Sequence, residues 1–378
     1  MANNNKDNVK DAPNKLRVGI TIGDTNGVGP EVLLKALAAP EMWELCTPVV
    51  YGSAKALAYH RKAIEIQGFQ LNIVKDGQQP RDTMVNLVEV FDEVKITLGE
   101  PDKAAGHAAY LALEAAVNDL KQGNIDVLVT APINKDNIQS DDFTFAGHTE
   151  YLQDRLADSA DDRALMILFN DRLRVALVTT HLPLSEVPAA ITVDAVVEKL
   201  RTFNRSLRRD FNILRPRIAV LSLNPHAGEN GLLGNEEKEV IIPAMQQALD
   251  SDDKVLAFGP FPADGFFGSE QYRHFDGVLA MYHDQGLTAF KALAQDDGVN
   301  FTAGLPFVRT SPDHGTGYDI AGKGVANENS MRQAIYAAID IFRNRCRYDE
   351  ARRNPLKKLY VDRGKDNVVL DLTKDEDL

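Results

Sequence analysis

The stretch that decides the fold is Val278–Gly286, VLAMYHDQG, where an apolar run leads directly into His283, Asp284 and a glycine. The same pattern occurs in VALVTTHLPL, where His181 follows the run, and in IAVLSLNPHAGE, where His226 does. Residues that are apolar at consecutive positions are typical of strands buried on both faces, as in a parallel sheet.

Other short apolar runs alternate with helical patterns along most of the chain. We predict strands over residues 17–22, 47–51, 127–130, 164–170, 174–179, 218–223 and 277–282. Helices are predicted over 106–124, over 192–211 with Thr192 as its N-cap, and over 235–249. This alternation indicates an α/β protein with a mainly parallel sheet.

Length and composition limit the class of protein. A chain of 378 residues suits two lobes. The composition, 44% hydrophobic and 26% charged, is ordinary for a globular protein, and no apolar run approaches the roughly 18–20 residues that cross a bilayer. The net charge of −13 argues against nucleic acid as a partner.

Three observations concern location and the chain ends. Residues 1–15 are polar, which predicts a disordered leader and no secretory signal. Cys46 and Cys346 lie far apart and suggest no disulfide framework, so a cytoplasmic protein is expected. The charge-rich segment from Tyr348 is expected to be peripheral.

The three histidines are candidate metal ligands. Ligands of open α/β sheets gather at the carboxyl ends of the strands, so His181, His226 and His283 could converge there. Three protein ligands with an open position are typical of a catalytic metal site. Three unrelated histidines, each with its own local hydrogen bond, remain the alternative.

Three loops carry further candidates. The glycines of ITIGDTNGVGPE (20–31) allow a ligand to approach the backbone, or simply form a tight turn. In TFAGHTEYL, His148 and Thr149 could hold a small polar ligand, or Thr149 could cap the following helix. Asp264, in GPFPADGFF, could meet a polar substrate group or only form a turn.

Residues 287–330 are the densest region. Lys291, Asn300 and Arg309 surround the turn-rich TAGLP and provide the donors that a phosphate requires, although each alone could be a surface residue. The glycines of DHGTGYDIAGKG favour a nucleotide over a complex turn.

Taken together, GDTNGVGPE, GHTEYL, VALVTTHLPL, LNPHAGENGLLGNEE, GPFPAD, YHDQGL and VNFTAGLPFVRTSPDHGTGYDIAGKG resemble the 4-hydroxythreonine-4-phosphate dehydrogenase family of vitamin B6 (pyridoxal phosphate) biosynthesis. The resemblance covers residues 17–338. DHGTGYDIAGKGVAN is also similar to the adenine-binding loop of isocitrate and isopropylmalate dehydrogenases. The implied fold is the two-lobed α/β/α architecture of that superfamily, not a standard Rossmann domain. The implied lobes are residues 16–135 with 300–378, for the cofactor, and 136–299, for the metal and the dimer contact.

The resemblance also implies roles for individual residues. The metal ligands would be His181 and His226 of one chain and His283 of the other, in a homodimer with its active site at the interface. The metal would be divalent, commonly Zn²⁺, with Mg²⁺ or Co²⁺ as alternatives. His148, Thr149, Lys291, Asn300 and Arg309 would bind the substrate. By superfamily analogy, the loop that contains His314, Gly315, Asp319 and Asn327 would bind the adenosine of NAD or NADP.

The implied reaction oxidises 4-phosphooxy-L-threonine at its C3 hydroxyl and decarboxylates the product to 3-amino-2-oxopropyl phosphate. Lys291 and Asp264 are the candidate bases, and Asp284 could orient the ring of His283. A dehydrogenase of 4-phospho-D-threonate or erythronate is the nearest alternative. A phosphate acyltransferase and a non-catalytic metal-binding protein are the other two.

Overall fold

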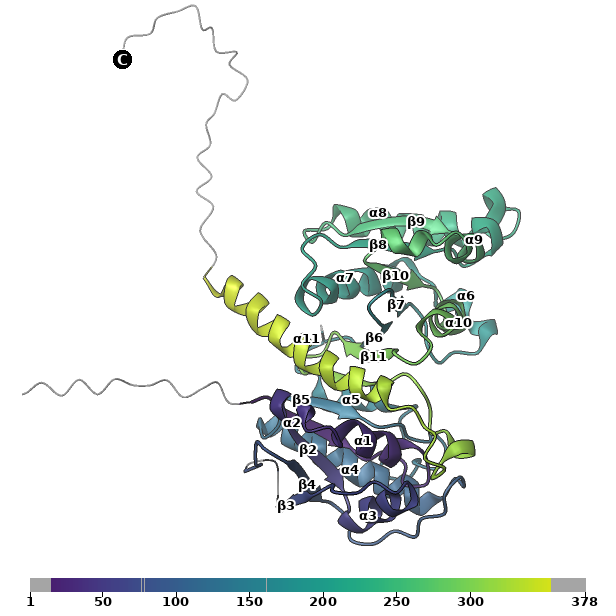
Figure 1. Cartoon of the computed structure of the whole chain (residues 1–378). Helices are drawn as coiled ribbons and strands as arrows, with labels where there is room; N and C mark the ends of the chain where they lie inside the picture. Colours follow the sequence, from purple (N-terminus) through teal and green to yellow (C-terminus); the bar gives the residue numbers. More distant parts are fainter. Residues whose placement is uncertain (1–14, 76, 78, 161, 355–378) are drawn as a thin grey trace, which may run out of the picture.

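The computed structural model describes residues 15–75, 77, 79–160 and 162–354, so most of the predicted leader and the last 24 residues lie outside the described residues. Two lobes share one sheet (Figure 1), whose strand order is β3-β4-β2-β1-β5-β12-β11-β6-β7-β10-β8-β9. The strands are β1 (Arg17–Thr21), β2 (Thr47–Gly52), β3 (Leu71–Val74), β4 (Val85–Glu89), β5 (Val127–Thr130), β6 (Leu165–Phe169), β7 (Arg174–Leu177), β8 (Arg217–Leu221), β9 (Leu256–Phe261), β10 (Gly277–Ala280), β11 (Val299–Ala303) and β12 (Arg309–Pro312).

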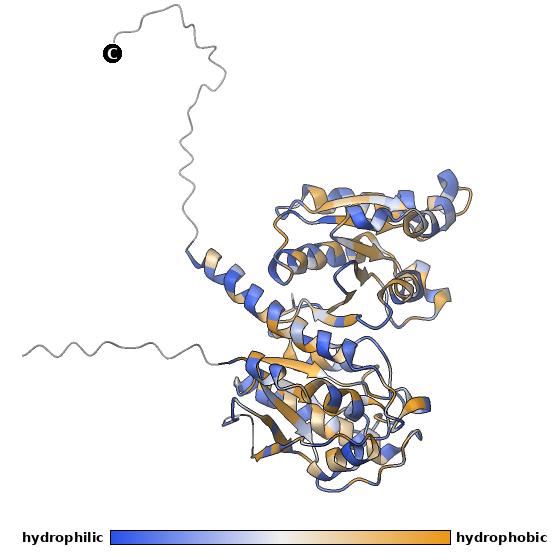
Figure 2. Ribbon diagram, viewed as in Figure 1, coloured by the Kyte–Doolittle hydropathy of each residue, from blue (hydrophilic) through white to orange (hydrophobic). Residues whose placement is uncertain are grey.

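Most neighbouring strands of the sheet run parallel, which confirms the predicted α/β class. The antiparallel pairs are β11 with β12, β11 with β6, and β6 with β7. Each of the seven predicted strands is present, with ends that differ by a few residues. Figure 2 shows the apolar residues concentrated along the strands, as expected for a sheet covered on both faces.

Five strands were not predicted from the sequence: β3, β4, β9, β11 and β12. The reason is clearest for β12, whose sequence is the polar RTSP although all four residues are buried. Thr310 donates from its hydroxyl to the carbonyl of Ala334, and Arg309 binds two threonine hydroxyls. Tertiary partners therefore satisfy side chains that, read from the sequence, suggest a surface turn.

The helices are α1 (Gly29–Leu37), α2 (Glu41–Leu45), α3 (Ala54–Ala63), α4 (Lys103–Gln122), α5 (His148–Leu156), α6 (Val187–Ala190), α7 (Val193–Arg209), α8 (Ile242–Asp250), α9 (Ala263–Gly268), α10 (His283–Ala294) and α11 (Asn329–Arg353). The predicted capping of α7 is confirmed, because the Thr192 hydroxyl accepts a hydrogen bond from the amide of Ala195. The predicted helix 106–124 is α4, which ends at Gly123 with φ +74°. None of the helices in the described part of the chain is long and apolar enough to cross a bilayer.

The centre of the sheet joins the two lobes. Strands β12 and β11 lie between β5 of one lobe and β6 of the other, and α11 packs against β5, β11 and β12 (Figure 1). The predicted division into residues 16–135 with 300–378 and residues 136–299 stays a prediction, because the sheet is continuous at this point. The segment expected to be peripheral begins inside α11, whose hydrophilic final turns extend away from the lobes (Figure 2).

The first glycine loop, residues 23–29, is a buried structural element. Asp24, Thr25 and Asn26 are at most 1% exposed. A Cβ on Gly27 would lie 2.6 Å from the carbonyl oxygen of Thr316, so this position requires glycine. The loop therefore packs against the segment after β12, which favours the structural alternative left open by the sequence.

Hydrogen bonds beyond the ends of β7 and β10 bring two of the predicted ligand segments together. The amide of Val178 donates to the carbonyl of Ala280, and the amide and hydroxyl of Thr179 both donate to that of Met281. The pairing thus continues past the strands and positions the residues that follow them. His283 does not end a strand, as the sequence suggested, but begins α10.

Candidate active site

Two of the predicted metal ligands lie side by side in one chain. The ring centroids of His181 and His283 are 6.2 Å apart. Their proximity follows from the pairing beyond β7 and β10, since each histidine lies two or three residues after a paired position. The pair therefore lies at the carboxyl edge of the sheet, where ligands of α/β proteins bind.

Each of the two rings has a carboxylate at Nδ1. The Nδ1 of His181 lies 3.2 Å from Oε1 of Glu150, and the Nδ1 of His283 lies 2.7 Å from Oδ1 of Asp284. Because an ionised carboxylate can only accept, Nδ1 of each ring is the donor and Nε2 keeps its lone pair. A carboxylate behind an imidazole is the usual support of a metal-binding histidine.

The third histidine is not part of this pair. His226 is exposed and lies in an irregular segment, 225–231, with φ +53°. Within the described residues, no group of three or more His, Cys, Asp or Glu side chains is placed to hold a metal ion. One chain alone thus supplies two of the three predicted ligands at this point.

A polar cavity of about 250 Å³, here called the central cavity, opens beside His181. Residues from both lobes line it. They include Thr130, Lys135, His148, Thr149, Glu150, His181, Asn300, Arg309, Asp313, His314 and Gly315. Four of the five predicted substrate-binding residues, His148, Thr149, Asn300 and Arg309, are therefore brought together.

Arg309 gives the central cavity a buried positive charge. Its side chain donates to the hydroxyls of Thr130 and Thr302, and no carboxylate within the described residues bonds to it. Burial lowers the pKa of Arg309 to about 9, against the attraction of Glu150. A buried guanidinium without an ion partner requires an anion for full stabilisation.

Several side-chain atoms around the central cavity are buried and lack a partner among the described residues. They are Nε2 of His148, Oε2 of Glu150, Oδ1 of Asn300 and Nε2 of His314. Burial holds the pKa of His148 well below its usual range, and the charges of Arg309 and Lys135 act in the same direction. Polar atoms that are buried without partners are costly unless a ligand binds them.

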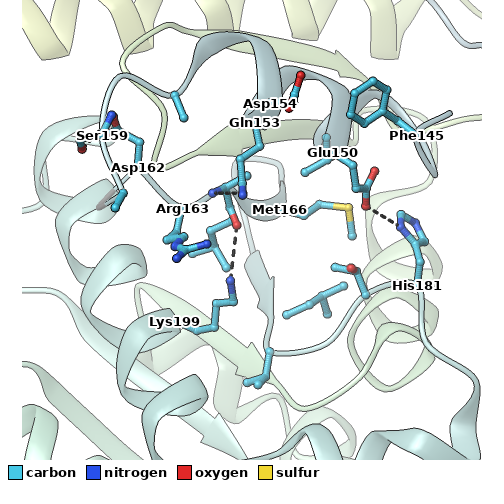
Figure 3. A pocket seen from close by; sticks show the side chains of 18 residues that line it. Phe145, Glu150, Gln153, Asp154, Ser159, Asp162, Arg163, Met166, His181 and Lys199 are labelled. Atoms are coloured by element: carbon cyan, nitrogen blue, oxygen red, sulfur yellow. Dashed lines mark hydrogen bonds and ion pairs between the residues drawn. The ribbon is translucent and has the colours of Figure 1, made fainter. Parts of the chain in front are cut away.

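A larger cavity of about 560 Å³ adjoins the central one, and we call it the α5 cavity. It lies between α5, β6, β7 and α7 (Figure 3). Glu150 and His181, joined by a hydrogen bond, form one end of it, and Arg163 and Lys199 lie farther along (Figure 3). Thr149, Glu150, Met166 and His181 line both cavities, so the two are continuous at the histidine.

A third cavity of about 260 Å³, the Val28 cavity, opens on the other side of His314. Its walls are apolar at Val28, Val32, Ile320 and Ala326, and polar at Gln295, Asp296, His314 and Asn327. It shares Asp313, His314 and Gly315 with the central cavity. The predicted cofactor residues His314, Gly315 and Asn327 are thus brought together, whereas Asp319 is exposed and lines neither of these cavities.

The two candidate bases lie outside the cavities described above. Lys291 is exposed on α10 and donates from Nζ to the carbonyl of Asp313, 2.8 Å away, at the rim of the central cavity. Asp264 is exposed in the first turn of α9 and lines none of the three cavities.

Sequence reasoning assigned no role to Lys135 or Glu150, although both line the central cavity. The Nζ of Lys135 donates to Nε2 of His181 across 2.9 Å. A signal was available for Lys135, because the segment 131–137 follows the predicted strand β5 as the histidines follow theirs. The place of Glu150 depends on the tertiary contact with His181.

The protein has a two-lobed α/β fold with polar cavities at the carboxyl edge of its sheet. Beside the cavities lie a buried arginine that has no carboxylate partner among the described residues and two neighbouring imidazoles. These features are typical of the class of enzymes that act on small anionic substrates. The family model of the pyridoxal phosphate biosynthetic protein PdxA matches residues 44–338, and the chain belongs to this family. The resemblance found in the sequence is confirmed.

Individual relatives agree with the family match. A 4-hydroxythreonine-4-phosphate dehydrogenase of Bacteroides thetaiotaomicron is 56% identical over 367 residues, which cover 96% of this chain and 99% of the relative. A 4-hydroxythreonine-4-phosphate dehydrogenase of a Sulfurihydrogenibium species is 41% identical, and the match covers 86% of this chain and 98% of the relative. The crystal structure of 4-hydroxythreonine-4-phosphate dehydrogenase from Klebsiella pneumoniae superposes with a TM-score of 0.72 at 34% identity, over 88% of this chain and 99% of that one.

Proposed function

We propose that this protein is an NAD- or NADP-dependent dehydrogenase that oxidises 4-phosphooxy-L-threonine at C3 and releases 3-amino-2-oxopropyl phosphate and CO₂. The observation that carries the proposal is the central cavity, which the buried cation Arg309 lines together with His148 and Asn300 beside His181. Nε2 of His148 and Oδ1 of Asn300 are buried without a partner among the described residues. The family and the names of its members support the same reaction.

The phosphate would bind to Arg309, with the amino end of α5 beside it. His148 and Thr149 are the first two residues of this nine-residue helix, so their amides lack partners inside the helix. Arg309 would supply donors in a fixed fork, and the phosphate would supply the anion that the buried guanidinium lacks. Binding at this remote end would position C3 near the histidines.

A divalent metal, Zn²⁺ in our proposal, fits the donors that the chain presents. His181 and His283 offer Nε2 lone pairs, and carboxylates hold both rings in the required tautomer. The resemblance implied that His283 comes from the second chain, but His283 lies beside His181 in one chain. We therefore propose that His226 completes the set from a second copy of the chain, since it lies apart from the pair. When bound, the metal supplies Lewis-acid polarisation of the substrate oxygens, and the nicotinamide supplies the hydride acceptor.

The Val28 cavity fits the adenosine part of the cofactor. Its valine, isoleucine and alanine walls suit a flat aromatic base, and Asn327 and His314 offer polar groups at its edge. The residues that it shares with the central cavity would let one bound cofactor reach both spaces. Asp319 stays a prediction that this arrangement does not favour.

The reaction removes a hydride from C3 and a proton from its hydroxyl, and the resulting β-keto acid loses CO₂ and gains a proton at C2. Lys291 is the better placed of the two candidate bases, because its bond to Asp313 puts it at the rim of the central cavity. Asp264 lines none of the three cavities in one chain and would have to be contributed by a second copy.

A homodimer with a shared site is part of the proposal. Large apolar side chains are exposed near two of the predicted ligands in the sequence: Leu182 (43%) and Leu184 (70%) follow His181, and Leu232 (80%) and Leu233 (45%) lie six and seven residues after His226. Apolar groups grouped beside functional residues are typical of a protein interface. Both cysteines are free thiols, which fits the proposed cytoplasmic location.

The deciding experiment measures NADH formation by absorbance with metal-replete protein and 4-phosphooxy-L-threonine, with and without a chelator. Turnover that the chelator abolishes supports the proposal. A parallel assay with 4-phospho-D-threonate tests the alternative substrate. If only this sugar acid is turned over, the proposed substrate is wrong but the proposed metal-dependent oxidation still holds.

A further inference from the structure

The segment that carries His226 has an unusual backbone. All five residues from 226 to 230 have positive φ angles, between +42° and +76°. Residues other than glycine rarely adopt this left-handed conformation, because their Cβ comes too close to the following carbonyl oxygen. Only Gly228 among the five is a glycine. The turn is therefore strained, and the residues around it must hold it in place.

The buried residue Glu237, which is only 2% exposed, supplies much of this restraint. Its Oε1 accepts hydrogen bonds from the amides of Leu223 (2.9 Å) and Asn224 (2.8 Å), and its Oε2 accepts one from Nδ2 of Asn224 (3.1 Å). A Cβ added to Gly228 would come within 2.7 Å of Oε2 of Glu237. The carboxylate thus fixes the approach to the turn and also packs against the turn itself.

Neighbours of Glu237 hold the two ends of the turn. Before it, Nδ2 of Asn224 also donates to Oε2 of Glu236 across 2.7 Å. At its far end, Nζ of Lys238 donates to the carbonyl of Asn230. The residues that restrain the turn therefore come from the beginning of the π-helical segment Glu237–Ile241 and the residue before it.

The approach to the turn is also tied to the helix that begins with His283. Nε2 of Gln285 donates to the carbonyl of Ser222 across 2.6 Å, and its Oε1 accepts from the amide of Met281 across 2.8 Å. Gln285 belongs to the first turn of α10, so one framework positions both His283 and the segment before His226. His226 itself is exposed, as a ligand contributed to a second copy has to be.

We propose that Glu237 is a positioning residue that holds the left-handed turn and thereby presents His226 to the metal of a second copy. This inference rests on the proposed function and adds the residue on which the third ligand depends. A ligand that is held in place beforehand loses little conformational entropy when the metal binds, whereas a mobile one loses more. Replacement of residues behind a metal ligand typically weakens metal binding by about 10–100-fold.

The test titrates Zn²⁺ alone into metal-free, full-length wild type and Glu237→Gln and measures Kd by calorimetry. In the glutamine an NH₂ group replaces one oxygen, and it would face either the two backbone amides or Nδ2 of Asn224, all of which are donors. We expect Kd to rise at least about tenfold. Glu239→Gln is the matched control, because Glu239 lies in the same π-helical segment but is exposed, and its Kd should equal that of the wild type.

A double-variant cycle separates positioning from general damage. If Glu237 acts through His226, then Glu237→Gln should have no further effect on Kd in a His226→Ala background. Effects that multiply, or a changed sedimentation coefficient in Glu237→Gln, overturn the proposal. If circular dichroism shows that Glu237→Gln does not fold, Asn224→Ala takes its place, because it removes one donor and keeps both backbone bonds of the carboxylate. An unchanged Kd in that variant then overturns the proposal.

The outcomes distinguish this inference from the proposed function. Weaker Zn²⁺ binding in His226→Ala, together with an unchanged Kd in Glu237→Gln, overturns the role of Glu237 and leaves the proposed function intact. An unchanged Kd in His226→Ala removes His226 from the metal site and overturns both the role of Glu237 and the proposed ligand set.

Discussion

The ammonium group of Lys135 lies 2.9 Å from Nε2 of His181, the nitrogen that a metal would bind. The two cannot use the same lone pair, so metal binding must displace Lys135. Lys135 therefore competes with the metal for Nε2 of His181, and substitution of Lys135 tests whether His181 is a metal ligand.

We predict that Lys135→Met raises the affinity of the protein for Zn²⁺. The change removes the hydrogen bond that metal binding must break and also a positive charge beside the metal cation. We therefore expect the binding free energy of Zn²⁺ to become more favourable by roughly 1 kcal/mol, which lowers Kd about fivefold. Calorimetric titration of metal-free protein measures it. Lys62→Met, at an exposed lysine outside the three cavities, should leave the affinity unchanged. Equal affinities in wild type and Lys135→Met would argue against His181 as a ligand.

We predict that His283→Ala abolishes metal retention and lowers turnover on the order of a hundredfold or more, because Lewis-acid catalysis contributes several kcal/mol. The fold should persist, since His283 is only partly buried at the start of α10. Metal analysis and circular dichroism check the two statements. His107→Ala, at an exposed histidine of α4, is the control. Normal activity without His283 would exclude it from the site.

Two buried arginines provide a matched pair. Arg309 has no carboxylate partner within the described chain, whereas Nε of Arg345 donates to Oδ1 of Asp210 across 2.6 Å. We expect Arg345→Met to lower the free energy of unfolding by about 3–5 kcal/mol, because it leaves the buried Asp210 without its cation.

Arg309→Met should be much less destabilising, by about 1 kcal/mol, since only neutral hydrogen bonds are lost. Its kcat/KM should nevertheless fall by at least about tenfold, because the phosphate loses charge-assisted bonds. Urea unfolding and steady-state kinetics measure the two variants side by side. A larger loss of stability in Arg309→Met than in Arg345→Met would contradict the proposal that the anion partner of Arg309 is the substrate.

His60 predicts a pH dependence of stability. The side chain is fully buried on α3, its Nε2 lies 2.7 Å from the carbonyl oxygen of Thr25, and burial lowers its pKa. The unfolded chain therefore binds a proton near pH 6.5 that the folded chain does not, so stability is present above this pH and is lost as the pH falls below it. His60→Gln keeps a donor toward Thr25 and should show a smaller loss between about pH 7 and 5 in urea unfolding. An unchanged slope would show that His60 binds protons equally in the folded and unfolded chain, so that burial does not lower its pKa.

The sequence was sufficient for the fold class and for most of the predicted substrate-binding residues that line the central cavity, because both depend on local signals. Apolar runs located β7, β8 and β10, and the carboxyl-edge rule pointed to the residues that follow them. Arg309 was predicted to bind an anion, but its strand was not predicted, because the burial of RTSP depends on Thr130, Thr302 and Ala334.

The same limit applies to Lys135 and Glu150. Each contacts His181, which lies 46 and 31 residues away in the chain. The segment of Lys135 follows a predicted strand, but its partner is not encoded by any periodicity or local motif, since both contacts with His181 arise only when distant segments fold together.

The strand order has a consequence for synthesis on the ribosome. The middle of the sheet, β11 and β12, is the last part of it to be translated, whereas its neighbours β5 and β6 emerge more than a hundred residues earlier. Until residue 312 has left the exit tunnel, β5 and β6 are open edges in the nascent polypeptide, and such edges are prone to pair with other chains. The protein should therefore depend on chaperones during translation far more than its finished form suggests, and a ribosome stalled before β11 should carry two incomplete sheets.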